Sequence, residues 1–162
     1  MPMDNGRTYI AILIDSLNKK IEVLNRIKDI NASQRDVASN GEFDDEQWEK
    51  TLDEKAILID KLQELNNGFE SVYERVRSEL NEKSSEYKEE ITQLKSLISK
   101  ITDLSMDIQA EEKRNSELVT KCFTKMRTRL KATKDTNKVA NSYMQTMAKM
   151  NYVEPQFMDK KK

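Results

Sequence analysis

Carboxylate pairs are the groups in this chain whose type and spacing come closest to catalytic chemistry. They occur at Asp44-Asp45, Glu89-Glu90 and Glu111-Glu112, and two neighbouring carboxyl groups can share the roles of general acid and general base. All three pairs stand in stretches rich in Lys and Glu, where such pairs usually lie on solvated helix faces. We therefore expect these carboxylates to face solvent rather than to form a catalytic dyad.

The other residue types that support catalysis or metal binding are missing or isolated. The chain contains no His, which removes the usual general base, metal ligand and pH switch. Its three glycines, Gly6, Gly41 and Gly68, lie too far apart to form a phosphate-binding loop. Cys122, the single cysteine, stands beside Phe123 in a helical apolar pattern, so we expect a small core residue. We predict no enzymatic activity, no metal site and no cofactor.

Composition and periodicity together predict long helices. Charged residues make up 35% of the 162 residues, with 3 Gly and 2 Pro, a mixture typical of coiled coils and other long helices. Apolar residues recur at steps of three and four, which indicates amphipathic helices. The pattern predicts three helices near residues 5–39, 45–83 and 86–150, followed by a flexible tail at 151–162. We expect a single all-α domain over 1–162, an elongated up-down-up antiparallel three-helix bundle or coiled coil with an overlong C-terminal helix.

Local signals define the start and the continuity of the second helix. Asp44 is placed to be its N-cap, with Gln47 three residues later. Phe43 and Trp48 occupy the flanking positions of a hydrophobic staple. The apolar pattern keeps its phase through Gly68, so we predict one continuous helix with a weak point there.

The third helix is predicted to be longer than its two partners. At about 1.5 Å per residue the three helices span roughly 50, 60 and 95 Å, so the third should extend about 30 Å beyond the others. We expect its apolar stripe to lack a partner within the chain in that part. Either the end bends back, or the chain forms a homodimer, or another protein covers the stripe. An uncovered apolar stripe usually marks an interaction site. The candidate partner-binding residues are Leu118, Val119, Cys122, Phe123, Met126, Leu130, Tyr143, Met144, Met147 and Met150.

Four methionines of this stripe, Met126, Met144, Met147 and Met150, recur at helical spacing. They are either packing filler or a pliable surface for an amphipathic partner helix, because unbranched thioethers adapt to irregular shapes. The missing internal partner favours the second interpretation.

Charge is distributed unevenly along the chain. Residues 118–162 carry a net charge of +8, whereas residues 1–117 carry −9. A basic arm of this kind can bind nucleic acid. The near-neutral total charge of −1 and the low aromatic content of 6% argue against that function. A membrane-surface helix is also weakly supported, because the apolar face of this region lacks tryptophan.

The N-terminal region contains no recognisable targeting signal. No basic start precedes an apolar run, and the longest apolar run, Tyr9 to Ile14, is far shorter than the ~20 residues that cross a bilayer. We therefore expect a cytoplasmic protein without stable insertion in a membrane.

Three stretches of the chain resemble the FlgN family of bacterial flagellar export chaperones, in the form associated with Gram-positive anaerobes. They are "WEKTLDEKAILIDKLQELNNGFESVYERV" (48–76), "LKSLISKITDLSMDIQAEEKRNSEL" (94–118) and the terminal "FMDKKK" (157–162). Glu54-Lys55, followed by apolar positions and then Gly68-Phe69, is similar to the second helix of the family. The Glu-rich segment that contains Asn115 is similar to the third.

The resemblance implies a mechanism. FlgN-like proteins are cytoplasmic helical bundles that bind the apolar C-terminal helix of hook-associated proteins. They prevent early assembly of this cargo and bring it to the type III export apparatus. In the family the C-terminal helix usually contacts the cargo, and a tyrosine near the C-terminus docks at the export gate. Here Tyr143 and Tyr152 are both candidates for that tyrosine. A self-assembling structural coiled coil and, with less support, a nucleic-acid-binding basic arm remain the alternatives.

Overall fold

The computed structural model describes residues 5–130, 141–142 and 144–145. Three long helices account for most of them: α1 (Asn5–Ser39), α2 (Asp45–Glu82) and α3 (Lys88–Leu130). The predicted bounds of the first helix are confirmed, and those of the second differ by one residue. The third begins at Lys88 instead of residue 86, because residues 83–87 form the turn from α2. The predicted extension of this helix to residue 150 and the predicted tail lie largely outside the described residues.

Most buried residues of α1 follow steps of three and four over the whole helix. These positions are Ile10, Leu13, Leu17, Lys20, Leu24, Ile27, Asn31, Gln34 and Ala38. In α2 the buried residues follow such steps from Trp48 to Leu62 and again at Val76 and Leu80, and partly buried apolar residues fill the interval. A stripe with this seven-residue repeat keeps one face of a helix against its neighbours when the helices coil slightly around one another. The apolar periodicity of the sequence therefore explains which faces are buried.

The start of α2 has the predicted cap. Asp44 has an extended backbone conformation, and its carboxylate accepts a hydrogen bond from the backbone N–H of Gln47 at 3.1 Å. Phe43 contacts Trp48 with ring centroids 5.7 Å apart, as a hydrophobic staple requires. The helix then continues through Gly68 without a break, which confirms the predicted continuity.

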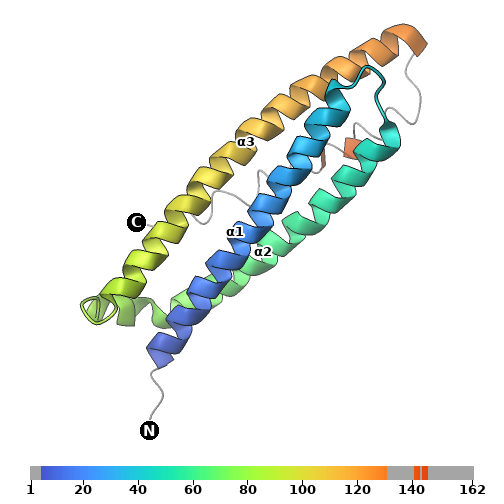
Figure 1. The fold of residues 1–162 in the computed structure, drawn as a ribbon. Coiled ribbons are helices and arrows are strands. Elements are labelled where there is room, and N and C mark those ends of the chain that lie inside the picture. The colour runs from blue at the N-terminus through green and yellow to red at the C-terminus, as the bar shows by residue number, and fades with distance from the viewer. Residues whose placement is uncertain (1–4, 131–140, 143, 146–162) are drawn as a thin grey trace.

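The hydrogen bonds and ion pairs between helices establish their directions. Between α1 and α3 the paired residues stay 79 to 84 positions apart, from Arg7–Glu90 to Cys122–Ala38, so these helices run parallel. Between α1 and α2 the separation falls from 49 for Ser16–Leu65 to 17 for Gln34–Thr51, so these run antiparallel. The chain is an all-α three-helix bundle in which α1 packs against both α2 and α3 (Figure 1).

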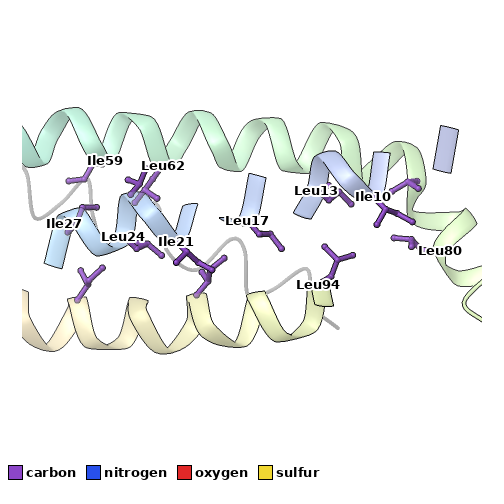
Figure 2. Packing of buried hydrophobic residues seen from close by; sticks show 14 of the residues in the cluster. Ile10, Leu13, Leu17, Ile21, Leu24, Ile27, Ile59, Leu62, Leu80 and Leu94 are labelled. Carbon is purple, nitrogen blue, oxygen red and sulfur yellow. The ribbon is translucent and has the colours of Figure 1, made fainter. Parts of the chain in front are cut away.

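The main apolar core occupies most of the bundle. Figure 2 shows Ile59 and Leu62 of α2 opposite Leu24 and Ile27 of α1. The buried apolar residues of this core come from all three helices, between Ile10 and Ile108. They include Tyr87 in the turn before α3. A second, smaller apolar cluster lies at the other end of the bundle, where α1 ends and α2 begins.

Candidate partner-binding surface

The first four of the predicted partner-binding residues lie at this second end of the bundle. Leu118, Val119 and Phe123 pack with residues of α1 and α2 in the smaller apolar cluster. We call this cluster the distal core. It consists of Val37, Ala38, Phe43, Trp48, Leu52, Leu118, Val119 and Phe123.

The expectation that this part of the stripe lacks a partner within the chain is wrong. Val119 is only 2% exposed, and Phe123 makes an edge-to-face contact with Phe43 at 5.6 Å between ring centroids. The reason lies in the register of α1 and α3. Arg7 pairs with Glu90 at 2.8 Å, so the two helices begin level and Phe123 lies level with the end of α1.

Cys122 also faces this end of the bundle. Its thiol donates a hydrogen bond to the backbone carbonyl of Ala38, with 3.1 Å between Sγ and O. Burial raises the pKa of the Cys122 thiol, with a smaller opposing effect from the charge of Lys125. A thiol that stays protonated is a poor nucleophile. The structure is therefore consistent with the predicted packing role of Cys122.

Beyond Phe123, α3 continues past the ends of the other two helices. It contains 43 residues against 35 in α1, although both begin level, and Figure 1 shows its orange end extending past the α1–α2 turn. We call residues 124–130 the overhang. An overhang of α3 is confirmed, but over the described residues it measures roughly 10 Å, at about 1.5 Å per residue.

The described side chains of the overhang, at residues 124–128, include one half-buried methionine and two exposed cations. Met126 is half-buried, while Lys125 and Arg127 on either side of it, and Lys121 one turn earlier, are exposed. An apolar position among cations matches an amphipathic helix with an acidic polar face.

The remaining predicted residues can be placed only in part. Leu130 ends the described helix. Met144 is 65% exposed in a short helical piece. Tyr143, Met147, Met150 and Tyr152 lie outside the described residues, so the partner-binding and gate-docking roles assigned to them stay predictions.

A buried polar cluster separates the distal core from the main core. We call it the polar layer. It consists of Asn31, Gln34, Thr51, Lys55, Glu112 and Asn115, and all six residues are buried. The layer sits on the same three- and four-residue stripes as the apolar core, so polar side chains replace Leu and Ile at core positions.

Lys55 is the centre of the polar layer. Its side chain is 0% exposed and that of Glu112 is 3% exposed, and they form an ion pair across α2 and α3 at 2.5 Å. Lys55 Nζ also donates to Asn31 Oδ1 at 2.9 Å and to Gln34 Oε1 at 2.6 Å, both on α1. Each N–H of the ammonium group thus has an acceptor, and one side chain joins all three helices.

The remaining members of the layer complete these links. Gln34 Nε2 donates to Thr51 Oγ1 at 3.2 Å, and Thr51 Oγ1 donates to the backbone carbonyl of Trp48 at 2.6 Å. Asn115 Nδ2 donates to the backbone carbonyl of Asn31 at 2.9 Å. The layer thus fixes the helices in one register through directional bonds.

Burial dominates the electrostatics of the central pair. Loss of hydration lowers the pKa of Lys55 and raises the pKa of Glu112, while the attraction between the two charges opposes both shifts. A buried ion pair offsets its own desolvation only when its hydrogen bonds are complete. Because Lys55 has no spare donor and no solvent access, we assign the layer to structure rather than to catalysis.

The polar layer does not stand out in the sequence, for an identifiable reason. The segment Ala110–Ser116 looks like an interruption of the apolar stripe, and the Glu111-Glu112 pair looks like a solvated face. Glu112 is instead buried, so that expectation is wrong for this residue. Lys55 already falls on the apolar stripe of its helix, and a matching Glu and Asn on the stripes of the other helices is the signal that identifies the layer.

Within the described residues, no group of three or more acidic or Cys side chains is placed to hold a metal ion. Among the helices formed by those residues, none combines the length and hydropathy that a membrane crossing requires.

Comparison with known proteins gave no relative. No protein-family model, no curated protein and no solved structure matches this chain. The resemblance to flagellar export chaperones therefore rests on the three quoted stretches of sequence.

Proposed function

We propose that this protein is a non-enzymatic flagellar export chaperone of the cytoplasm. In this role it binds the C-terminal amphipathic helix of a hook-associated protein, prevents its early assembly and delivers it to the export apparatus. The observation that carries the proposal is the overhang of α3, which places Met126 among exposed cations beyond the ends of α1 and α2. The three FlgN-like stretches supply the identity of the cargo.

The bundle suits this role because the residues that stabilise the fold and the residues proposed to bind the cargo lie in different parts of it. The main core holds the three helices together and the polar layer fixes their register, so the overhang need not contribute to the fold. Amphipathic helices are commonly bound through apolar side chains at helical spacing, and methionines adapt to partners of different shape. A chaperone that must release its cargo benefits from such a surface.

Isothermal titration calorimetry with synthetic peptides tests the proposal. The peptides are the C-terminal helices of the hook-associated proteins encoded in the same genome, and we expect micromolar or tighter binding to the full chain. Replacement of Met126 by Ser should weaken binding about tenfold, because it removes a half-buried apolar side chain from the overhang. Met106→Ser is the matched control, since Met106 is also a methionine of α3 and is 63% exposed on the body of the bundle.

Three outcomes would contradict the proposal. No binding by any of the peptides, together with a concentration-dependent dimer, would favour the structural coiled coil. Strongly salt-dependent binding to any DNA duplex would favour the basic arm. Equal loss of binding in the Met106→Ser control would place the cargo site on the body of the bundle.

A further inference from the structure

The distal core is separated from the rest of the bundle by polar side chains. Its buried members, Ala38, Trp48, Leu52 and Val119, form a cluster distinct from the one that fills the main core. Between the two lies the polar layer, where Lys55 bonds to residues of both α1 and α3. Proteins open locally in cooperative units, and units with few apolar contacts open most readily. The small distal core meets that description, and the polar layer is its boundary.

The α1–α2 turn covers the stripe of α3 at this end. Phe43, the last residue of the turn before the N-cap, contacts both Trp48 and Phe123 through its ring, at 5.7 and 5.6 Å. The preceding residues 40–42 are exposed. Phe43 is therefore the part of the turn that shields Phe123 from solvent.

We propose that residues 40–44 form a latch over α3, and that this end of the bundle opens independently of the main core to admit a partner. The partner we infer is an amphipathic helix with an acidic polar face. Its apolar side chains would take the place of Phe43 against Phe123. This inference rests on the proposed function and adds how its binding surface becomes accessible.

The exposed cations of α3 support an acidic partner, and the latch beside them is itself acidic, with Glu42 and Asp44 exposed. Lys121 and Lys125 are exposed on the same turns of α3 as the covered apolar residues, and Arg127 follows on the overhang. The segment 118–162 carries a net charge of +8. Opposite charges of this kind steer association and fix the orientation of the bound helix.

The polar layer limits how far the opening extends. Lys55 Nζ holds α1 through Asn31 and Gln34, and holds α3 through Glu112. Separation of the helices at this level would leave buried charges without partners, which is strongly unfavourable. The latch can therefore open while the register of the main bundle is kept.

Trp48 provides a direct test of separate opening without any partner. It is the single tryptophan of the chain and is fully buried in the distal core, so its fluorescence reports this end, whereas far-UV circular dichroism reports all three helices. In urea the fluorescence transition of the full chain should precede the circular dichroism transition. Coincident transitions would overturn the proposal, because they would show one cooperative unit.

Two phenylalanine variants distinguish an effect on the latch from an effect on the stability of the whole bundle. Phe43→Ala should lower the midpoint of the fluorescence transition by about 1 M urea, and should leave the main circular dichroism transition in place. Phe69→Ala is the matched control, because Phe69 is a partly buried aromatic of the main core that stacks on Tyr73 at 5.9 Å. It should shift the main transition. The reverse pattern would overturn the assignment of Phe43 as the latch.

Calorimetric titration with the hook-associated peptides then tests whether opening of the latch increases the affinity for a partner. Phe43→Ala should bind the peptides several-fold more tightly than the native chain, because the stripe is already uncovered. Equal or weaker binding would overturn the latch. If neither protein binds any peptide, the proposed function fails, while the fluorescence comparison still decides whether the distal end opens separately.

Discussion

Lys55 has surroundings that its residue type rarely has. Lysine is almost never fully buried unless its charge is paired, and here each N–H of the ammonium group has an acceptor in the polar layer. A buried pair of this kind adds little net stability but is costly to break on one side. The layer is therefore better understood as a device that selects one helix register than as a source of stability.

Removal of one member of the central pair should destabilise the fold strongly. We expect Lys55→Met to lower the free energy of unfolding by about 3–5 kcal/mol, because Glu112 is left buried without its partner. The double variant Lys55→Met with Glu112→Leu should be more stable than Lys55→Met alone. Urea unfolding followed by circular dichroism measures both.

A surface pair serves as the control for this experiment. Lys19 pairs with Asp15 at 3.0 Å with both side chains more than half exposed, so Lys19→Met should change the free energy of unfolding by less than about 0.5 kcal/mol. If the effects of Lys55→Met and Glu112→Leu simply add in the double variant, the two charges are not coupled and the account of the layer is wrong.

Cys122 makes stability depend on pH above neutrality. Burial raises the pKa of its thiol above the ordinary value of 9.0. Above pH 9.0 the unfolded chain therefore loses the thiol proton while the folded chain retains it, so the contribution of Cys122 to stability is complete below pH 9.0 and falls as the pH rises. The native chain should lose stability relative to Cys122→Ala between pH 8 and pH 10. A constant difference between the two proteins in urea unfolding would contradict the shift.

Buried apolar residues and buried polar residues differ in how well the sequence predicts their surroundings. The stripe positions of Ile10, Leu52 and Ile101 follow from periodicity alone, since a helix face repeats every three or four residues. The pairing of Lys55 with Glu112 does not, because the two residues are 57 positions apart and meet only through the register between α2 and α3. The role of a polar residue on one stripe can be inferred only when the residue that faces it on the neighbouring helix is known.

At the scale of elements, the start of α2 depends on one side chain. Asp44 accepts a hydrogen bond from the backbone N–H of Gln47, and Asp44→Ala should cost about 1 kcal/mol of stability, within a range of roughly 0.5–2 kcal/mol. Asp44→Asn is the control, because asparagine caps about as well and should preserve most of the stability. Thermal unfolding compares the three proteins, and equal loss in both variants would show that charge rather than capping is responsible.

Two helical glycines should respond oppositely to alanine. A Cβ on Gly68 meets nothing within 4 Å, so Gly68→Ala should stabilise the chain by about 0.5–1 kcal/mol through helix propensity. A Cβ on Gly6 would collide with the Glu79 carboxylate and with the Tyr87 hydroxyl, 2.6 Å away. Gly6→Ala should therefore give no such gain. Denaturant unfolding of both variants tests this, and equal stabilisation would contradict the close packing around Gly6.

The position of each helix in the sequence is predictable from local signals. The extent to which neighbouring helices lie alongside one another is not. Asp44 and the phase of the pattern across Gly68 are local signals, and both predictions are confirmed. Helix lengths predict that α3 extends about 30 Å beyond its partners, and the candidate residues of its uncovered stripe begin at Leu118. Lengths do not show where two helices begin relative to each other, and the Arg7–Glu90 pair makes α1 and α3 begin level.

In the whole molecule, the bundle combines three structural parts. The main core and the polar layer hold α1, α2 and α3 in register, the distal core closes one end, and the overhang projects from that end (Figure 1). Binding to a partner is therefore expected at one end of the elongated molecule, where it disturbs the fewest internal contacts.

Hydrogen exchange measured by mass spectrometry, with and without the C-terminal peptide of a hook-associated protein, tests this account most directly. We predict that the peptide slows exchange in α3 from Leu118 to Leu130, and that exchange in the main-core part of α2, around Ile59 and Val76, stays unchanged. Protection confined to the main core, or no protection anywhere at saturating peptide, would contradict the assignment of the binding surface to this end of the bundle.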